Sequence, residues 1–388
     1  MKRRKIVFIA SNMLLLFSLS LFNSNNTILE LGLAQNFENS YHHNLIGSQG
    51  AWAITNGTKD ITVAVIDSGI DFFHSELQNV AWINENEISN NSIDDDGNGY
   101  VDDIRGWDFV NDDNNPGPET GDLINRHGTF ITGLIAAPLN GKGPVGIAQN
   151  VSIMDVRVLS SDNYLGVSYL GFGDAIRYAV DNGADVLSIS IHNMSPDDIY
   201  HDDILYAVEN NVVVVAITGN TDDGGLEFRT YPGGYDEVIA VGASTANNLK
   251  ASYSNYGLPW TEIVAPVGNR LDSTTLDNTY GWGWGTSYAC PQVAAVVALM
   301  KSLNNSLSVS EIRNILRKSA TDIGDPGKDI YFGYGLLNAT KAVMAVLDPS
   351  VLEVETDKTN TSFIYYTTAV IILAGFVVIR KKRKKTKM

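Results

Sequence analysis

Short runs of aliphatic and β-branched residues recur through the middle of the chain, separated by longer stretches in which apolar and polar positions are mixed. Five runs have the length of buried strands, and they cover residues 60–66, 151–158, 185–191, 212–217 and 237–242. Continuous apolar runs of this length are typical of strands that are covered on both faces. Helices are predicted from Ala175, Tyr200 and Gln292. The pattern predicts an α/β fold with a mostly parallel sheet and helices on both faces.

Three polar residues stand where these predicted elements begin or end. Asp67 ends the first strand run, so its carboxylate is expected at the carboxyl edge of the sheet, where ligands bind in open α/β folds. His127 begins a predicted apolar helix. Ser287 follows a glycine-rich run and precedes the apolar helix 293–300, whose first backbone N–H groups favour developing negative charge.

An aspartate, a histidine and a serine are the components of nucleophilic acyl transfer. A serine hydroxyl needs a base within hydrogen-bond reach and a buried carboxylate that holds the base in the right tautomer. Any one of these residues alone is more often a turn or capping residue. Here each lies within its own motif, VAVIDSGID, HGTFITG and GTSYACP, in the order Asp, His, Ser.

These motifs resemble those of the subtilisin-like serine proteases, the subtilases, over about residues 42–346. The resemblance implies endopeptide hydrolysis through an acyl-enzyme. It assigns Asp67 to orienting the imidazole, His127 to general base and then acid, and Ser287 to attack on the scissile carbonyl. It also assigns Asn220, at the end of VVVVAITGN, to donating a hydrogen bond to the oxyanion beside the serine backbone N–H.

The chain departs from the family in the segment that resembles one wall of the primary specificity pocket. That wall comprises Ser190, Ile191 and His192, with Ile191 and His192 in place of the family's Leu and Gly, and it predicts restricted specificity. An extended substrate is expected to pair near Tyr164 to Tyr169, through Tyr164, Leu165 and Gly166. An ordinary surface loop is the alternative for this segment.

Two other residues offer rival chemistry. Cys290 is the only cysteine, so it forms no internal disulfide; it is expected to be a small buried side chain, with a cysteine nucleophile as the weaker alternative. His74 follows Asp67 closely but lacks the motif around His127, and a local structural role is predicted. Zinc is not expected, since neither HExxH nor a cysteine pair occurs.

The charge of the chain is unevenly distributed. Of its 27 basic residues, four lie at Lys2–Lys5 and seven at Arg380–Lys387, which leaves 16 against 44 acidic residues and a net charge of −28 for the rest. So acidic a body argues against nucleic acid as a partner and is compatible with cationic substrates or metal ions.

The two ends of the chain carry signals for export and anchoring. Residues 1–34 read as a signal peptide or an N-terminal anchor, and residues 35–347 as the catalytic domain, with no room for a full prodomain. Residues 348–362 read as a polar linker, 363–379 as a transmembrane helix and 380–388 as a basic cytoplasmic tail. These features predict a single-pass enzyme of the cell membrane whose catalytic domain lies outside the cytoplasm.

An acidic segment opens with IDDDGNGYVDD and predicts a calcium site. Its alternating oxygen-bearing residues and Gly99 match the first half of a calcium loop, although Arg105 stands where an EF-hand has its bidentate glutamate. A solvated loop rich in Asx turns is the alternative. The predicted ligands are Asp94, Asp96, Asn98, Tyr100, Asp102 and Asp103.

Two functions follow from these observations. The first is a membrane-anchored serine endopeptidase that processes exported proteins or peptides. The second is a membrane-tethered pseudoprotease that binds peptides without cutting them, an idea that rests on His192 in the pocket and is opposed by the complete set of four catalytic residues.

Overall fold

The computed structural model of this chain describes residues 41–119, 126–160, 171–193, 200–221 and 224–353. At its centre is a seven-stranded parallel sheet in the order β2-β3-β1-β4-β5-β6-β7. The predicted α/β fold is confirmed. The strands are β1 (Thr62–Asp67), β2 (Gly106–Asp108), β3 (Ser152–Arg157), β4 (Val186–Ile189), β5 (Val213–Ile217), β6 (Ile239–Ser244) and β7 (Thr261–Pro266).

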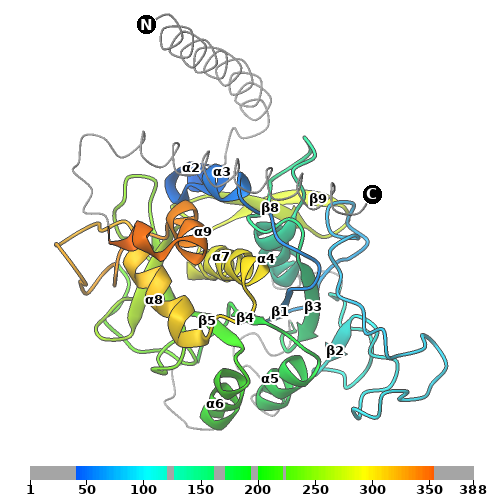
Figure 1. Cartoon of the computed structure of the whole chain (residues 1–388). Helices are drawn as coiled ribbons and strands as arrows, with labels where there is room; N and C mark the ends of the chain where they lie inside the picture. Colours follow the sequence, from blue (N-terminus) through cyan, green and yellow to red (C-terminus); the bar gives the residue numbers. More distant parts are fainter. Residues whose placement is uncertain (1–40, 120–125, 161–170, 194–199, 222–223, 354–388) are drawn as a thin grey trace, which may run out of the picture.

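Helices cover both faces of the sheet, as Figure 1 shows. One face packs against α4 (His127–Ala136), α7 (Cys290–Leu303), α8 (Val309–Ser319) and α9 (Ala339–Leu347). The other packs against α5 (Phe172–Asp181) and α6 (His201–Glu209). Alternate residues of β1 divide between the two cores, Val63 and Val65 in the first and Ala64 and Ile66 in the second, which is why the run is apolar throughout.

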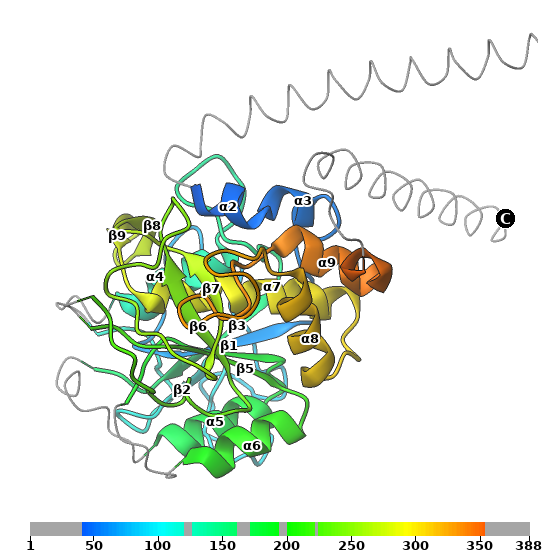
Figure 2. The same cartoon turned by 90° about the vertical axis from the view of Figure 1, so that its left-hand side faces the viewer.

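An antiparallel hairpin, β8 (Leu271–Thr275) and β9 (Thr279–Gly283), lies outside the main sheet and beside α4 (Figures 1 and 2). The hydroxyls of Ser273 and Thr274 donate to the carbonyls of Phe130 and Thr129, both at 2.8 Å. These bonds hold the hairpin against the helix that begins with His127.

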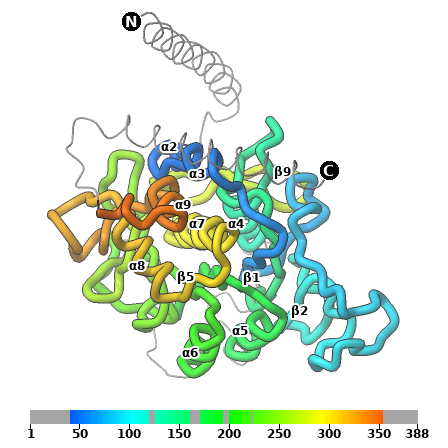
Figure 3. The backbone as a smooth tube through the Cα atoms, viewed as in Figure 1, coloured from blue at the N-terminus to red at the C-terminus, as the bar shows by residue number. Residues whose placement is uncertain are grey.

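The long segment between β1 and β2 extends away from the body of the molecule, as the cyan part of the tube in Figure 3 shows. It contains the predicted calcium loop. Most of its residues from Ile83 to Val101 are exposed or only partly buried.

The ends of the described fold differ from the predicted boundaries in one respect. The predicted linker at 348–362 begins with a 3-10 turn, η4 (Pro349–Leu352), in which Val351 is buried. The fold therefore continues past residue 347. Among the residues that the structure describes, no helix is long and apolar enough to cross a membrane. The predicted segments 1–34, 363–379 and 380–388 lie outside the described residues.

Two adjacent histidines are buried where the chain enters the fold. They lie in α2 (Tyr41–Ile46), which is followed by α3 (Ser48–Trp52). The ring nitrogens of His43 bond the Ser48 hydroxyl and the Val145 carbonyl at 2.9 Å, whereas both ring nitrogens of His42 lack a partner among the described residues. Burial lowers the pKa of His43 to about 4, and burial together with the charge of His43 lowers the pKa of His42 well below its usual value.

We predict that the free energy of unfolding falls as the pH is lowered from about 7 to about 5. Below about pH 6.5 the unfolded chain protonates both histidines while the folded chain keeps them neutral, so each costs up to about 1.4 kcal/mol per pH unit. His42→Phe should flatten this slope, because it removes one of the two buried imidazoles. The phenyl ring replaces a side chain that has no hydrogen bond among the described residues. Urea unfolding in a Ser287→Ala background, which lacks the predicted nucleophile, measures the effect.

The control is Leu249→Phe, since Leu249 is exposed and carries no titratable group. This variant should keep the pH slope of the parent. An unchanged slope in His42→Phe would show that the buried histidines do not set the pH dependence.

Candidate active site

The carboxylate of Asp67 and the imidazole of His127 are in direct contact at the carboxyl edge of the sheet. The Nδ1 atom of His127 lies 2.8 Å from Oδ1 and 2.9 Å from Oδ2 of Asp67. The Asp67 side chain is 1% exposed and also accepts a hydrogen bond from the Ser68 backbone N–H at 2.8 Å. With the proton of Nδ1 directed at the carboxylate, Nε2 is left free to act as a base.

Glycines at two positions allow the end of β1 to approach the start of α4. A Cβ atom on Gly128 would lie 2.5 Å from the carbonyl oxygen of Gly69, and Gly69 itself has a φ of +95°. The Ser68 hydroxyl accepts a hydrogen bond from the Gly128 backbone N–H at 3.1 Å. The glycines that follow Asp67 and His127 in the two motifs thus bring the motifs together.

Ser287 lies in the 3-10 turn η3 (Thr286–Tyr288), immediately before α7. Its hydroxyl donates to the Ser190 carbonyl at 3.2 Å, and the Ser190 hydroxyl donates to the Ser287 carbonyl at 2.9 Å. The ring of the next residue, Tyr288, lies 5.6 Å from the ring of His127. The structure therefore brings the serine turn to the histidine, with the hydroxyl turned toward Ser190 in this resting state.

The side chain of Asn220 is fixed against the same turn. Its Oδ1 accepts from the Thr286 backbone N–H at 2.8 Å and from the Thr286 hydroxyl at 3.0 Å, which leaves Nδ2 as the free donor. A Cβ atom on Gly285 would lie 3.6 Å from Nδ2 of Asn220 and 3.8 Å from the Ser287 backbone nitrogen. Because Gly285 has no side chain, two N–H donors border a space in which an oxyanion could sit.

Comparison with known proteins agrees with this geometry. Residues 58–335 match the model of the subtilase family of peptidases. The chain belongs to the subtilase family. The predicted family and enzyme class, a subtilisin-like serine endopeptidase, are thus confirmed.

Three similar proteins are proteases of Bacillus. The chain is 35% identical over 76% of its length to the thermophilic serine proteinase of Bacillus sp. strain AK1, 34% over 73% to subtilisin DY of Bacillus licheniformis, and 32% over 79% to the minor extracellular protease Epr of Bacillus subtilis strain 168. The matches cover 64%, 90% and 43% of these relatives, so the chain spans less than two thirds of the first and the third.

The two rival residues have structural roles. Cys290 is fully buried, its thiol lies 3.3 Å from the Val215 carbonyl, and burial raises the pKa of the thiol to about 12. A protonated, inaccessible thiol is not a nucleophile. His74 is buried as well, accepting from the Glu76 backbone N–H at 3.1 Å and bonding the Thr279 carbonyl at 2.9 Å. Its predicted local role is confirmed.

The three residues of the predicted specificity wall all lie within the described part of the chain. Ser190 contacts Ser287 as given above, and the side chains of Ile191 and His192 border a small cavity beside Tyr200 and Tyr231. Burial lowers the pKa of His192 and so favours the neutral imidazole. That these three residues form the substrate pocket remains a prediction. Tyr164, Leu165 and Gly166 lie outside the described residues.

A buried acidic residue near the site, Asp155, was not predicted as important. Asp155 lies in β3 and is 1% exposed; its Oδ2 accepts from the Ile70 backbone N–H at 2.9 Å, three residues after Asp67. Burial, with the negative charges of Asp108 and Asp67, raises the pKa of Asp155 well above its usual value. The shift favours the protonated form of Asp155, which lies in the strand paired with β1. The signal was present, since VSIMDVRVL places an acid inside a mostly apolar strand.

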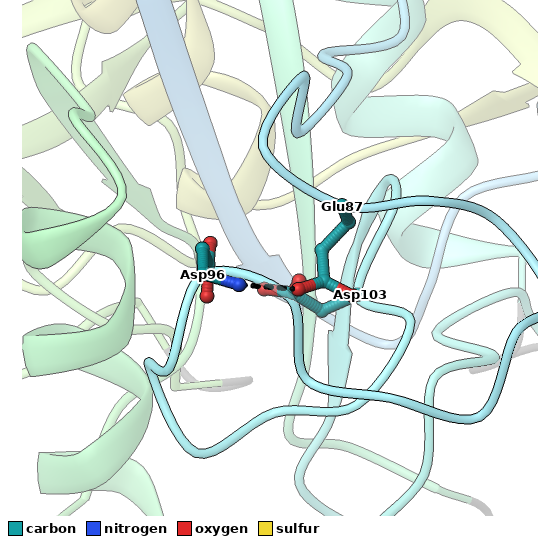
Figure 4. Close-up of side chains that lie close together, drawn as sticks. All are labelled: Glu87, Asp96 and Asp103. Carbon is teal, nitrogen blue, oxygen red and sulfur yellow. Dashed lines mark hydrogen bonds between the residues drawn. The ribbon is translucent and has the colours of Figure 1, made fainter.

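The acidic loop gathers three carboxylates, those of Glu87, Asp96 and Asp103 (Figure 4). One oxygen from each lies within 4.8 Å of the others. Asn84 donates from Nδ2 to Asp96 at 2.9 Å and to Asp103 at 2.8 Å, and Glu87 accepts from the Asp96 backbone N–H at 3.1 Å. A set of carboxylate oxygens fits a hard cation such as calcium.

This cluster differs from the predicted ligand set. The carboxylate of Asp94 accepts the backbone N–H groups of its own turn, from Gly97 to Gly99, and that of Asp102 accepts those of Asn91 and Ser92. The Tyr100 ring packs against Trp107 and Tyr178. Only Asp96 and Asp103 of the predicted residues join the cluster, with Asn98 donating to both from Nδ2. Glu87, before the motif, was missed.

We predict that Asn220→Ala lowers kcat by about 100- to 1,000-fold with little change in KM. The free Nδ2 donor is placed to bond the oxyanion that forms in the transition state, so its loss affects the chemical step and not substrate binding. The magnitude is the one known for such a donor in a subtilisin. Steady-state kinetics on a peptide substrate measures both constants. A normal melting temperature checks the fold, and a loss confined to KM would contradict the assigned role.

Proposed function

We propose that this chain is a serine endopeptidase that acts outside the cytoplasm, anchored in the cell membrane, and processes exported proteins or peptides. The observation that carries the proposal is the Asp67–His127 contact beside the turn that holds Ser287 and Asn220. Each of these residues plays the part that the family resemblance gave it.

Attack begins when the Ser287 hydroxyl turns from the Ser190 carbonyl to Nε2 of His127. The imidazole takes the proton as the oxygen bonds to the scissile carbonyl carbon, and the buried Asp67 carboxylate stabilises the imidazolium that forms. Negative charge moves to the carbonyl oxygen. Asn220 Nδ2 and the Ser287 backbone N–H are placed to receive it beside Gly285.

The second half of the reaction reverses the proton transfer. The imidazolium gives its proton to the leaving amine, the carbon–nitrogen bond breaks, and the acyl group stays on Ser287. Water then replaces the amine, with His127 again as base, and hydrolysis of the ester regenerates the hydroxyl.

Calcium is proposed as a structural ion of the acidic loop. Glu87, Asp96 and Asp103 would hold it, and Asp103 would tie it to the core because its Oδ2 accepts from the buried Tyr178 hydroxyl at 2.7 Å. Burial raises the pKa of Asp103, so its negative charge is disfavoured when no cation is bound. A bound cation would offset this cost and the repulsion among the three carboxylates. No catalytic step involves this ion.

The location and the substrate are inferred from the sequence outside the described residues. An apolar segment at 363–379 followed by a basic tail supports a membrane anchor, and a tethered protease meets exported chains as they emerge. Similar proteins include one named as an extracellular protease. The alternative, a pseudoprotease that only binds peptides, is not favoured, because the Asp67–His127 contact orients a catalytic base and peptide binding alone does not require one.

We predict that a membrane-impermeant fluorophosphonate labels the full-length chain on intact cells. The probe reacts only with a serine that has an activating base and an oxyanion site, so labelling reports on both chemistry and location. Ser287→Ala should abolish labelling and His127→Ala should reduce it strongly. The labelled chain should be recovered in the membrane fraction.

Each outcome tests a different part of the proposal. Equal labelling of wild type and Ser287→Ala, or none in either after permeabilisation, would contradict the protease. Labelling that requires permeabilisation would contradict the extracytoplasmic location, and recovery of the labelled chain from the medium would contradict the anchor.

We predict that chelation of calcium lowers the melting temperature by a few degrees and that Glu87→Gln removes this response. The glutamine keeps one oxygen for the backbone N–H groups of Asp95 and Asp96, but it loses the acceptor for that of Asp102 and the charge that binds the ion. Thermal unfolding with calcium or with chelator, in a Ser287→Ala background, measures it. The control is Asp112→Asn, at an exposed position after β2, and this variant should respond to calcium as the parent does. An equal melting temperature of the parent with and without calcium would exclude the site.

A further inference from the structure

Three large aromatic side chains are exposed in a row just before the catalytic serine. They are Tyr280 and Trp282 of β9 and Trp284, which follows it, with 43%, 51% and 47% of their surfaces exposed. Tyr280 and Trp282 are alternate residues of β9, so their side chains lie on the same side of the strand, and Trp284 continues this alternation one residue beyond its end. Trp284 is only three residues from Ser287. We call these three residues the aromatic ladder.

Each ring of the aromatic ladder is supported by a neighbour. Trp284 packs against Tyr253 with ring centroids 5.0 Å apart, and Tyr280 packs edge-on against the buried His74 at 5.5 Å. The guanidinium of Arg270 lies over Trp282, 5.8 Å from the ring centroid. Rings that are supported in this way lose little conformational freedom when a ligand covers them, which favours binding.

The aromatic ladder lies on the histidine side of Ser287. Arg126, directly before His127, donates from Nη2 to the Trp282 carbonyl at 3.4 Å, and β8 is bonded to α4. Ser190 contacts the serine through a different strand end, after β4. In the proposed reaction the leaving amine takes its proton from His127, so the leaving segment of the substrate begins on the histidine side of Ser287, the side to which the hairpin is bonded.

We propose that the aromatic ladder binds apolar and aromatic side chains of the substrate on the leaving-group side of the scissile bond. The inference rests on the proposed protease function and deepens it. Side chains on one face of an extended peptide repeat about every 7 Å, the same spacing as alternate residues of β9, so successive substrate side chains can meet successive rings. The preferred substrate is therefore an extended chain with aromatic or large aliphatic residues shortly after the cleavage point.

The test compares peptides that share one sequence before the scissile bond and carry either tryptophan or glycine at the second and fourth positions after it. Wild type should cleave the tryptophan peptide with a kcat/KM higher by about three- to tenfold, as expected for one or two aromatic contacts. Trp282→Ala and Trp284→Ala should lose this preference. A peptide anilide with the same acyl part has no leaving peptide. Relative to its hydrolysis, cleavage of the tryptophan peptide should fall in both variants, whereas cleavage of the glycine peptide should keep the wild-type ratio.

Matched variants separate binding from folding. Trp284→Phe should keep most of the preference, and Tyr331→Ala, which removes an aromatic ring that is 44% exposed on another part of the surface, should keep all of it. Failure of wild type to cleave any peptide or the anilide would refute the protease itself. If wild type hydrolyses the anilide but cleaves both peptides at equal rates, the proposed role of the aromatic ladder is wrong and the protease function stands. The role is also wrong if brominated phosphatidylcholine vesicles quench the fluorescence of Trp282 and Trp284 and no peptide preference is found.

Discussion

The contact between the end of β1 and the start of α4 is the constraint on which the active site depends. Asp67 is useful only if it is buried against His127, and the two lie 60 positions apart in the chain. The approach is possible because Gly69 and Gly128 present backbone where any side chain would collide. The Ser68 hydroxyl then bonds the Gly128 N–H, so the motif that supplies the acid also fixes the helix that supplies the base.

The parallel sheet brings the remaining groups to the same edge. Strands β1, β4 and β5 are neighbours, and Asp67, Ser190 and Asn220 follow their carboxyl ends. The serine turn docks on this edge because the Ser190 hydroxyl donates to the Ser287 carbonyl and the Asn220 side-chain oxygen accepts from the Thr286 backbone N–H. A site assembled from strand ends in this way is as rigid as the sheet, which suits a reaction that needs charges placed before they form.

Features governed by local sequence could be predicted, and those governed by tertiary contact could not. The five apolar runs became β1, β3, β4, β5 and β6, and the motifs contain the four polar residues that the structure gathers at one edge of the sheet. The three-residue β2 gives too short a signal, and the short run of β7 was overlooked. Glu87 was missed because it joins Asp96 and Asp103 through loop folding, and the roles of Asp94 and Asp102 as turn acceptors depend on backbone geometry that spacing does not reveal.

The two sides of Ser287 differ in how firmly they are tied to the catalytic machinery. Ser190 is bonded to Ser287 itself, so a change in that wall also disturbs the nucleophile. The hairpin is bonded instead to the backbone of α4 and to Arg126, and its aromatic rings are partly exposed. Its exposed residues can therefore vary without moving Asp67, His127 or Ser287. Substitutions in the hairpin can thus change the selectivity for the leaving segment with little effect on the catalytic step.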